Sequence, residues 1–351
     1  STIFFPGDRA LPPPIVDPLT NSTMRQALMY GFRTADVTVT GGGTIDGNGR
    51  AWWPYKPSGL TPTPAAELPP YLFTCALCDR LHVHDVRFQN GPFVNLSPKV
   101  SRDVLFENIT IANPIDSPNT DCIDPDSVLN MTVRNSTFAC GDDHISVKGR
   151  NYALSPWPAP ATRGLLVEGC TFLHGQGLTI GSRVQGGIDD VTFRDSVMIG
   201  SLTGIRLKAM REHGGTVSNL LFERLQLRSV GVLISLDMDF HHTGVRSADP
   251  PVYKHVTLRD ITGWGDVAGI LKCLPESPCE SLTLERVFPE GSSEVVLPYS
   301  CENLSGSCKD CGSWPALCPE LGGAVGGGGG FAGPRWLGST QERSSVEVRH
   351  T

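Results

Sequence analysis

The sequence predicts an all-β protein, a right-handed parallel β-helix, on three observations. Short runs of alternating apolar and polar residues recur along the chain, each with the length of a strand. Val86 and Val104 mark two copies 18 residues apart, and Leu220 and Val256 mark two copies 36 residues apart. Such spacing is typical of a solenoid, whose repeats are about 20–50 residues long. No helical pattern separates the copies, so they do not form a βαβ array. An antiparallel sandwich is the alternative, but Asn-Gly hairpin signals do not recur with the copies.

Each copy is an apolar run that ends at a polar residue of the kind that favours turns. Recognisable copies are 37–39, 84–90, 103–109, 131–135, 165–169, 190–195, 220–224, 255–260 and 281–286. Stacked in register, they would place equivalent residues of successive coils side by side, about 4.8 Å apart.

One domain is expected over residues 1–320. The proline-rich segment 1–35 should be irregular, with a short helix near Met24–Tyr30. A flap held by disulfides is predicted at about 300–320. The glycine-rich tail 321–351 is predicted to be flexible.

Composition excludes several functions. The chain has 351 residues and a formal net charge of −7, which argues against a general nucleic-acid surface. No apolar run approaches the roughly 20 residues of a membrane span. We therefore expect no nucleic-acid partner and no membrane span. The chain is also expected to be a monomer.

Cysteines and glycosylation sequons point to the secretory route and an extracellular or cell-wall location. Eleven is an odd number of cysteines, so at least one thiol is free or pairs outside the chain. Cys273 and Cys279 are expected to pair. The pattern Cys308-x-x-Cys311 is interpreted as a disulfide rather than a zinc site, because no histidine-rich partner accompanies it. The sequons lie at Asn21, Asn95, Asn108, Asn130, Asn135 and Asn303. Ser1 opens no signal peptide, which suggests a mature or trimmed chain.

Two acidic clusters organise the functional prediction. Asp121 and the pair Asp142-Asp143 are 21 residues apart, one expected coil, so three carboxylates should meet at one place. Repulsion and burial raise the pKa of at least one of them, and a proton donor beside a base is what glycosidic hydrolysis requires. The alternative is that these residues simply form turns.

A cationic pair lies further along the same predicted face. Arg206 and Lys208 are two residues apart, hence on one side of a strand. The glycine-rich turn 175–182 lies on the same predicted face. A cationic pair aligned beside three carboxylates suits a substrate that itself carries carboxylates. Ion pairing with the aspartates is the alternative.

These motifs resemble glycoside hydrolase family 28, the polygalacturonases, and most nearly its plant-type branch. The motifs that carry the resemblance are Gly43–Gly49 with Trp52-Trp53, Asp116–Asp121 with Ile123–Ser127, Gly141–Asp143, Ile180–Ser182 with Gly186–Ile188, and Arg206-x-Lys208. They keep the family order over about residues 36–320.

The resemblance implies a secreted enzyme that hydrolyses α-1,4-galacturonosyl linkages of pectin with inversion. Asp142 would be the general acid, and Asp121 with Asp143 would activate water. Arg206 and Lys208 would bind a substrate carboxylate. Asn119 would orient Asp121. No metal and no cofactor is expected, because proton transfer and charge stabilisation suffice.

Two departures from the family pattern are visible. Gln176 stands where the family usually has histidine, and it can bind a carboxylate or hydroxyl but cannot carry a proton charge. Arg183 stands where an acidic residue is common, which adds positive charge to the cleft or changes a surface pair. Two other functions stay open, a calcium-dependent pectate lyase and a non-catalytic polysaccharide-binding or structural β-helix. His144 is interpreted as a packed histidine rather than a catalyst.

Overall fold

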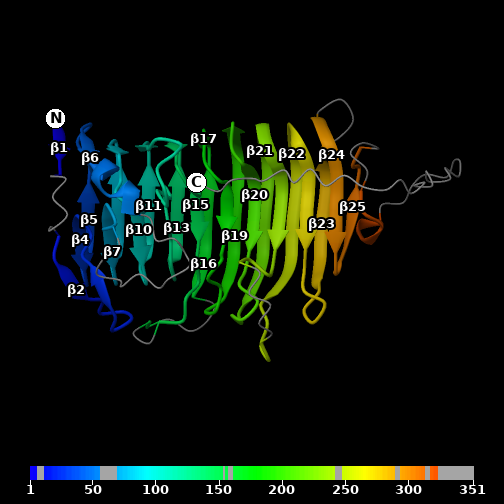
Figure 1. Ribbon diagram of the computed structural model, residues 1–351, viewed down its shortest axis with the longest axis horizontal. Coiled ribbons are helices and arrows are strands. Elements are labelled where there is room, and N and C mark those ends of the chain that lie inside the picture. Colours follow the sequence, from blue (N-terminus) through cyan, green and yellow to red (C-terminus); the bar gives the residue numbers. More distant parts are fainter. Residues whose placement is uncertain are drawn as a thin grey trace, which may run out of the picture.

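The computed structural model describes residues 1–5, 12–55, 69–152, 155–156, 161–241, 247–288, 293–312 and 317–322. Over these residues, parallel strands stack coil upon coil into one elongated body, from β1 at one end to β25 at the other (Figure 1). The fold is the predicted right-handed parallel β-helix.

Each coil contributes strands to three stacks. The first stack contains β4 (Met29–Phe32), β7 (Phe73–Ala76), β10 (Leu96–Lys99), β15 (Ile145–Val147), β18 (Leu178–Ile180), β20 (Thr203–Lys208) and β24 (Ser293–Glu302). The second contains β5 (Ala35–Val39), β8 (Asp79–His84), β11 (Arg102–Glu107), β13 (Leu129–Arg134), β16 (Thr162–Glu168), β23 (Cys279–Val287) and β25 (Leu304–Lys309). The third contains β1 (Thr2–Phe4), β6 (Thr44–Asp46), β9 (Arg87–Gln89), β12 (Thr110–Ala112), β14 (Thr137–Ala139) and β17 (Thr171–Phe172).

The remaining elements connect or flank these stacks. The long strands β19 (Ile188–Ile199), β21 (Thr216–Asp237) and β22 (Val252–Lys272) bend from one stack into another. β2 (Pro14–Val16) and β3 (Thr23–Arg25) form an antiparallel pair. Short 3-10 helices span Gly49–Ala51, Trp53–Tyr55 and Pro319–Leu321.

The polar residue that ends each sequence repeat forms a corner of the coil. Asn108 and Asn135 have left-handed φ angles of 51°, and Asp195 has a φ of 52°. Asn and Asp tolerate this region better than other side chains do. The corner directs the chain from the second stack into the third.

The core consists of ladders of apolar side chains that repeat from coil to coil. Phe88, Ile111 and Phe138 occupy equivalent positions of successive coils and are fully buried. Phe138 and Phe172 stack with ring centroids 5.4 Å apart. Since every coil covers its neighbours, the apolar alternation seen in the sequence is sufficient to build this interior.

The outer face of the second stack carries a ladder of alternating charge. Its members lie in register on successive coils, and we call them the charge ladder: Glu107, Arg134, Glu168, Arg194, Glu223, Arg259, Glu285 and Lys309. Arg134 lies 2.6 Å from Glu107, and Arg194 lies 2.7 Å from Glu168. Opposite charges therefore support the strand register along this face.

The N-terminal segment is more regular than predicted. Met24–Tyr30 forms no helix; it contains the end of β3 and the start of β4. β4 pairs with β7, Met29 lying opposite Phe73, and β1 pairs with β6. Pairing with the next coil outweighs a weak local helix preference.

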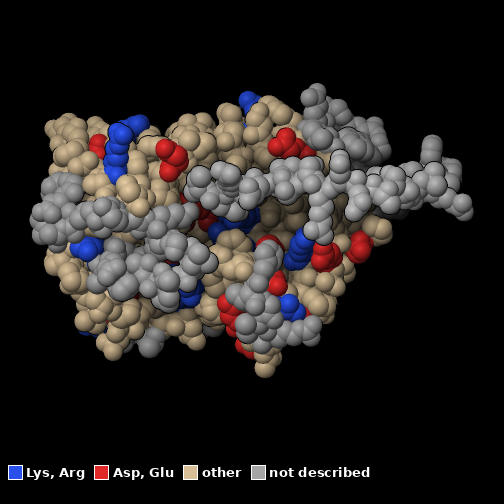
Figure 2. All heavy atoms as spheres, viewed as in Figure 1, with Lys and Arg blue, Asp and Glu red and all other residues tan. Residues whose placement is uncertain are grey.

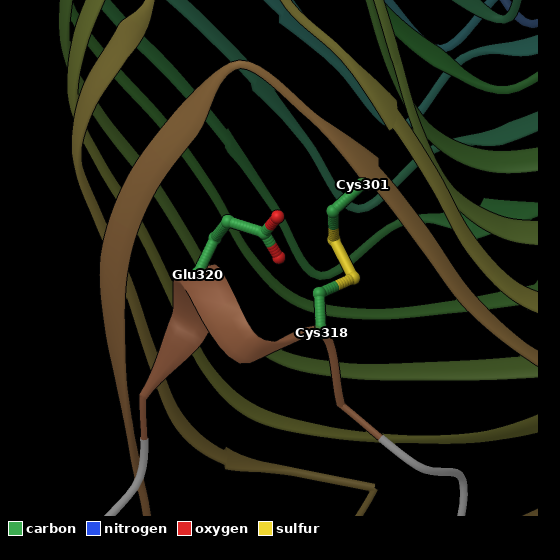
Figure 3. Close-up of side chains that lie close together, drawn as sticks. All are labelled: Cys301, Cys318 and Glu320. Atoms are coloured by element: carbon green, nitrogen blue, oxygen red, sulfur yellow. A yellow bond between two sulfur atoms is a disulfide. The ribbon is translucent and has the colours of Figure 1, made fainter.

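Disulfides close the loops at the C-terminal end. The predicted Cys273–Cys279 bridge is present. Cys308 pairs with Cys311, and Cys301 pairs with Cys318 beside the Glu320 carboxylate (Figure 3). These sulfurs are bonded to one another, so this Cys-rich segment is a covalent clasp and not a zinc site.

The odd cysteine is Cys170, which is buried and free. Most of the predicted flexible tail, residues 323–351, lies outside the described residues, whereas Leu321 is buried. No helix in the described part of the chain is long and apolar enough to cross a membrane.

Candidate active site

The predicted site residues meet on the outer face of the first stack, near the middle of the solenoid. A cavity of about 580 Å³ opens there. Its lining is Asn119, Asp121, Asp142, Asp143, Ser146, Lys148, Gln176, Gly181, Ser182, Arg206, Lys208, Asp237, Phe240 and His241. Figure 2 shows basic and acidic atoms gathered in the middle of one face of the molecule. Every predicted site residue therefore lines this one cavity.

The coil that carries Asp121 lies directly against the coil that carries Asp142 and Asp143. The Cys122 amide donates to the Asp143 carbonyl at 3.0 Å, and a disulfide joins Cys122 to Cys140. On the other side, the Asp121 carbonyl accepts from the Asn95 side-chain amide at 2.9 Å. The backbone under all three carboxylates is thus fixed by neighbouring coils.

The loop before Asp121 is held by small side chains. The Thr120 hydroxyl accepts from the Gly141 amide at 3.1 Å. A Cβ on Gly141 would lie 1.9 Å from the Ser117 carbonyl oxygen, a distance that no side chain tolerates. Glycine before Asp142 is therefore required for the two loops to approach.

Asp143 is an ionised carboxylate. It is 1% exposed and accepts from the Thr179 hydroxyl at 2.7 Å and Arg206 Nη1 at 3.0 Å through Oδ1. Lys208 Nζ donates to its Oδ2 at 2.7 Å. Burial alone would raise the pKa of Asp143, but Lys208 and Arg206 lower it below its ordinary value.

Asp142, the next residue, has the opposite shift. Burial and the charge of Asp143 raise the pKa of Asp142 to about 6. Its Oδ2 accepts from Asn119 Nδ2 at 3.2 Å, and its Oδ1 accepts from the Asp143 amide at 2.9 Å. The expected partner of Asn119 was Asp121; the structure gives Asp142 instead.

Asp121 is buried and keeps a proton more readily than an exposed aspartate does. Burial, and after it the charges of Asp124 and Asp142, raise its pKa well above the ordinary value. Asp124 lies three residues along the chain and forms an ion pair with Lys148. Burial alone would lower the pKa of Lys148, but Asp124 and Asp121 raise it above its ordinary value, so this lysine stays charged.

Gln176 contacts a protein side chain where a substrate contact was predicted. Its Oε1 accepts from Arg206 Nη1 at 2.9 Å, and its backbone amide donates to the Asp142 carbonyl at 2.9 Å. Gln176 thus holds the guanidinium that pairs with Asp143, while its side-chain NH₂ group donates to no residue in the part of the chain that the structure describes.

His144 has the packed environment predicted for it. It is fully buried, its Nε2 lies 2.9 Å from the Leu173 carbonyl oxygen, and its ring meets Phe172 edge-on. Burial lowers the pKa of His144 to about 4, so the imidazole is neutral at ordinary pH.

Seven residues of the cavity lining were not among the predicted site residues: Ser146, Lys148, Gly181, Ser182, Asp237, Phe240 and His241. Asp124, the ion-pair partner of Lys148, belongs to a recognised motif but was not predicted as a site residue either. Asp237, Phe240 and His241 come from the end of β21 and the turn after it. No motif marks that turn. The Phe240 ring lies 4.9 Å from Lys208 Nζ and 5.4 Å from the Arg206 guanidinium.

The aspartates are close enough to share a cation, but their partners oppose one. Each of Asp121, Asp142 and Asp143 offers an oxygen within 4.8 Å of the others. Both oxygens of Asp143 already accept from donors, and two of these donors are the cations Arg206 and Lys208. A metal ion here would face two positive charges, so the donor set favours chemistry by proton transfer.

Comparisons with known proteins agree with this geometry. A family model described as glycosyl hydrolases family 28 matches residues 19–311. A probable polygalacturonase of Vitis vinifera is 28% identical over 84% of this chain and 60% of the relative. An exopolygalacturonase of Zea mays is 26% identical over 80% of this chain and 68% of the relative. The chain thus spans only about 60% of the length of the first relative.

Solved structures support the fold. An exopolygalacturonase from Thermotoga maritima superposes with a TM-score of 0.71 at 22% identity, covering 87% of this chain and 78% of that one. A polygalacturonase from Erwinia carotovora gives a TM-score of 0.72 at 21% identity, with coverage of 87% and 81%. The family model covers most of the chain, and plant polygalacturonases are among its relatives. The chain belongs to glycosyl hydrolases family 28.

Proposed function

We propose that this chain is a polygalacturonase, a hydrolase that cleaves α-1,4-galacturonosyl linkages of pectin or polygalacturonate. The observation that carries the proposal is the opposite ionisation of two adjacent residues. Asp142 holds a proton up to a pH of about 6, whereas Asp143 is ionised between Arg206 and Lys208. Hydrolysis of a glycosidic bond requires a general acid and a general base in one cavity.

The proposed reaction needs only these side chains and water. Asp142 donates its proton to the leaving glycosidic oxygen as the bond from that oxygen to C1 breaks. Water attacks C1, and its proton passes to the Asp143 carboxylate, while Asp121 forms a hydrogen bond with the same water. Asp143 then releases this proton to solvent and Asp142 takes one up, which restores both groups. The raised pKa of Asp142 keeps the acid loaded at mildly acidic pH.

The cations of the cavity support an acidic polysaccharide as substrate. Arg206 and Lys208 lie on one side of β20, facing the aspartates. A uronate carboxylate entering here can accept hydrogen bonds from both, since each cation has several donors and Asp143 uses few of them. We assign Asn119 and the NH₂ group of Gln176 to substrate hydroxyl or carboxylate oxygens.

Inversion is proposed from the family resemblance, because the distances alone do not give it. The nearest oxygens of the aspartates lie within 4.8 Å of one another. Carboxyl groups of inverting glycosidases are more often about 6.5–9.5 Å apart. Proton NMR of the first product resolves the question, since inversion predicts that the new reducing end is initially the β-anomer. An initial α-anomer would establish retention.

We also propose that the protein acts outside the cell or in the cell wall, as a monomer. Five disulfides are typical of a secreted protein. All the described residues that line the cavity come from one chain.

A non-catalytic polysaccharide-binding role is the second candidate. It is favoured by one observation, that Gln176 and Asp143 both engage Arg206, which leaves this guanidinium less free for substrate. A binding module would keep the cations and the cavity and would not need Asp142 protonated.

The test is reducing-sugar release from polygalacturonate at pH 5 with a chelator, while absorbance reports unsaturated product. The proposal expects new reducing ends without the chromophore. Calcium-dependent absorbance would identify a lyase. A folded sample that binds the polymer and releases nothing would establish the binding role.

A further inference from the structure

The outer face of the third stack carries an exposed tryptophan at the point where β21 runs beside β22. Val197 of β19 lies in register with Gln226 of β21, and Gln226 with Thr262 of β22, so these long strands continue the third stack here. A cavity of about 310 Å³ opens on this face, and its lining is Gln226, Leu227, Arg228, Thr262, Gly263 and Trp264. None of these six residues is among the described lining of the catalytic cavity, which lies on the first stack.

Trp264 is held in one orientation and is left uncovered. It is 42% exposed, and its chain neighbours are Gly263 and Gly265, so no adjacent side chain lies over the ring. Both neighbours must be glycine, because a Cβ at Gly263 or Gly265 would lie 2.5 Å or 1.7 Å from a carbonyl oxygen of β21. The indole Nε1 donates to the Ser229 hydroxyl at 3.2 Å. The backbone and this hydrogen bond therefore fix an aromatic surface that faces solvent.

Arg228 brings a positive charge to the same cavity. The register of β21 against β22 shifts beside it, and Ser229 there has a left-handed φ of 52°, the kind of irregularity that re-aims a side chain. The Arg228 guanidinium carbon lies 5.9 Å from the centre of the Trp264 ring, and Nη2 donates to Gln226 Oε1 at 2.5 Å. Arg228 forms no ion pair in the part of the chain that the structure describes. Since a guanidinium has five N–H donors, it can still bind an anion.

An aromatic ring beside a guanidinium and an amide suits an acidic sugar. The apolar face of a sugar ring can pack on an indole, while a carboxylate accepts hydrogen bonds from the two nitrogens of one guanidinium. Gln226 and Thr262 add groups that can bind hydroxyl oxygens. A small apolar area with polar neighbours is less typical of a stable protein interface, which buries about 800 Å² on each partner.

We propose that Gln226, Arg228, Thr262 and Trp264, here called the tryptophan platform, bind a strand of acidic polysaccharide outside the catalytic cleft. Trp264 packs against a sugar ring, and Arg228 binds the carboxylate of a uronate unit. A second contact with the same polymer raises the effective concentration of substrate at the cavity. This inference rests on the proposed acidic substrate but not on its hydrolysis.

The test is affinity electrophoresis in gels that contain polygalacturonate, with each variant in an Asp142→Asn background so that the gel polymer is not digested. Trp264→Ala removes the aromatic surface, and Arg228→Met removes the charge at similar volume. Parallel gels contain a neutral galactan. In the native background, hydrolysis of trigalacturonate reports whether the catalytic cavity is intact, because so short a ligand cannot occupy both sites. Near-UV circular dichroism and size-exclusion chromatography check the fold and the oligomeric state.

Arg87→Met is the matched control. Arg87 also lies on the outer face of the third stack, and it donates to Gln89, two residues away, at 2.9 Å. Arg228 and Gln226 have the same relation, but Arg87 contacts no aromatic ring in the part of the chain that the structure describes. The control therefore removes an exposed arginine of the same kind without a tryptophan beside it.

We expect Trp264→Ala and Arg228→Met each to weaken retention by polygalacturonate about tenfold, the scale of one charge-assisted hydrogen bond. Retention of Arg87→Met should equal that of the background protein. Hydrolysis of trigalacturonate by the two platform variants should stay within about twofold of the native rate, since neither residue lines the catalytic cavity.

Unchanged retention of both platform variants would overturn the inference, and so would an equal loss in Arg87→Met or an equal loss of activity on trigalacturonate. A loss in Trp264→Ala alone, or equal retention by galactan, would contradict an acidic ligand. A dimer that Trp264→Ala dissociates would assign this face to a second copy of the chain. If polygalacturonate does not retain the background protein, the proposed substrate and this inference fail together. If it does, while the native chain releases no reducing ends, only the hydrolase proposal fails.

Discussion

The charge ladder and the catalytic cavity use the same repeat for opposite purposes. On the charge ladder, each carboxylate lies beside a cation of an adjacent coil, and a hydrogen bond from Arg134 lowers the pKa of Glu107. In the cavity, three carboxylates converge, and burial with the charge of Asp143 raises the pKa of Asp142. Alternating charges on the outer face support the strand register, whereas like charges in a buried cavity keep one carboxyl group protonated.

The largest effect expected is that of Asp142→Asn on catalysis. An amide cannot donate the proton that the leaving oxygen needs, so reducing-end release should fall by about 10²–10⁴-fold. Steady-state rates on polygalacturonate measure this. Unchanged activity would remove Asp142 from the role of acid.

The same variant should be more stable at neutral pH. The folded-state pKa of Asp142, about 6, lies above the ordinary 3.8. Between these values the native state binds more protons than the unfolded state, so stability falls as pH rises through this window and the full penalty is present above it. Asparagine removes the penalty, by about 1–3 kcal/mol after allowance for partial exposure. Urea unfolding at pH 4 and pH 7 would show the gain at pH 7 only; a loss at both would contradict the pKa assignment.

Removing one cation from the cavity and one from the charge ladder tests the difference between the two regions directly. Lys148→Met leaves Asp124 buried without its cation and should cost about 3–5 kcal/mol. Arg194→Met, within the charge ladder and partly exposed, should cost about 0.2–1 kcal/mol, and less at high salt. Denaturant unfolding of both variants measures the difference. Equal costs would mean that an ion pair contributes the same stability in the cavity as on the charge ladder.

A smaller effect is expected at Gln176. Gln176→Ala removes the acceptor that holds Arg206, so kcat/KM should fall about tenfold while the unfolding free energy changes little. Gln176→Glu restores an acceptor for Arg206 and should recover part of the loss. An alanine variant with native kcat/KM would show that Arg206 needs no support from this side.

Much of the fold could be predicted, because each coil of a solenoid repeats the same sequence pattern. The left-handed corners at Asn108 and Asn135 and the apolar ladders recur in the sequence as they do in space. The charge ladder is also visible there as alternating Glu and Arg after each apolar run, but its significance depends on knowing the register. β1 and β4 escaped prediction because their partners, such as Phe73 for Met29, lie more than 40 residues away.

Part of the candidate site could also be predicted from the sequence, and part could not. The spacing of 21 residues correctly placed Asp121 beside Asp142. The partners of Asn119 and Gln176 could not be predicted, since side-chain direction depends on the packing of three coils. Asn95, which begins one of the sequons, is fully buried and donates to the Asp121 carbonyl, so this sequon reflects a structural asparagine in the fold.

The most direct test of the division of labour between Asp142 and Asp143 is the pH dependence of kcat/KM on a galacturonate oligomer. Because Asp142 must be protonated and Asp143 ionised, the rate should fall about tenfold per pH unit above a pH of about 6. Below a pH of about 6, kcat/KM should change little with pH, because the pKa of Asp143 lies below its ordinary value and this carboxylate stays ionised. A rate that stays constant or rises from pH 6 to pH 8 would contradict the account.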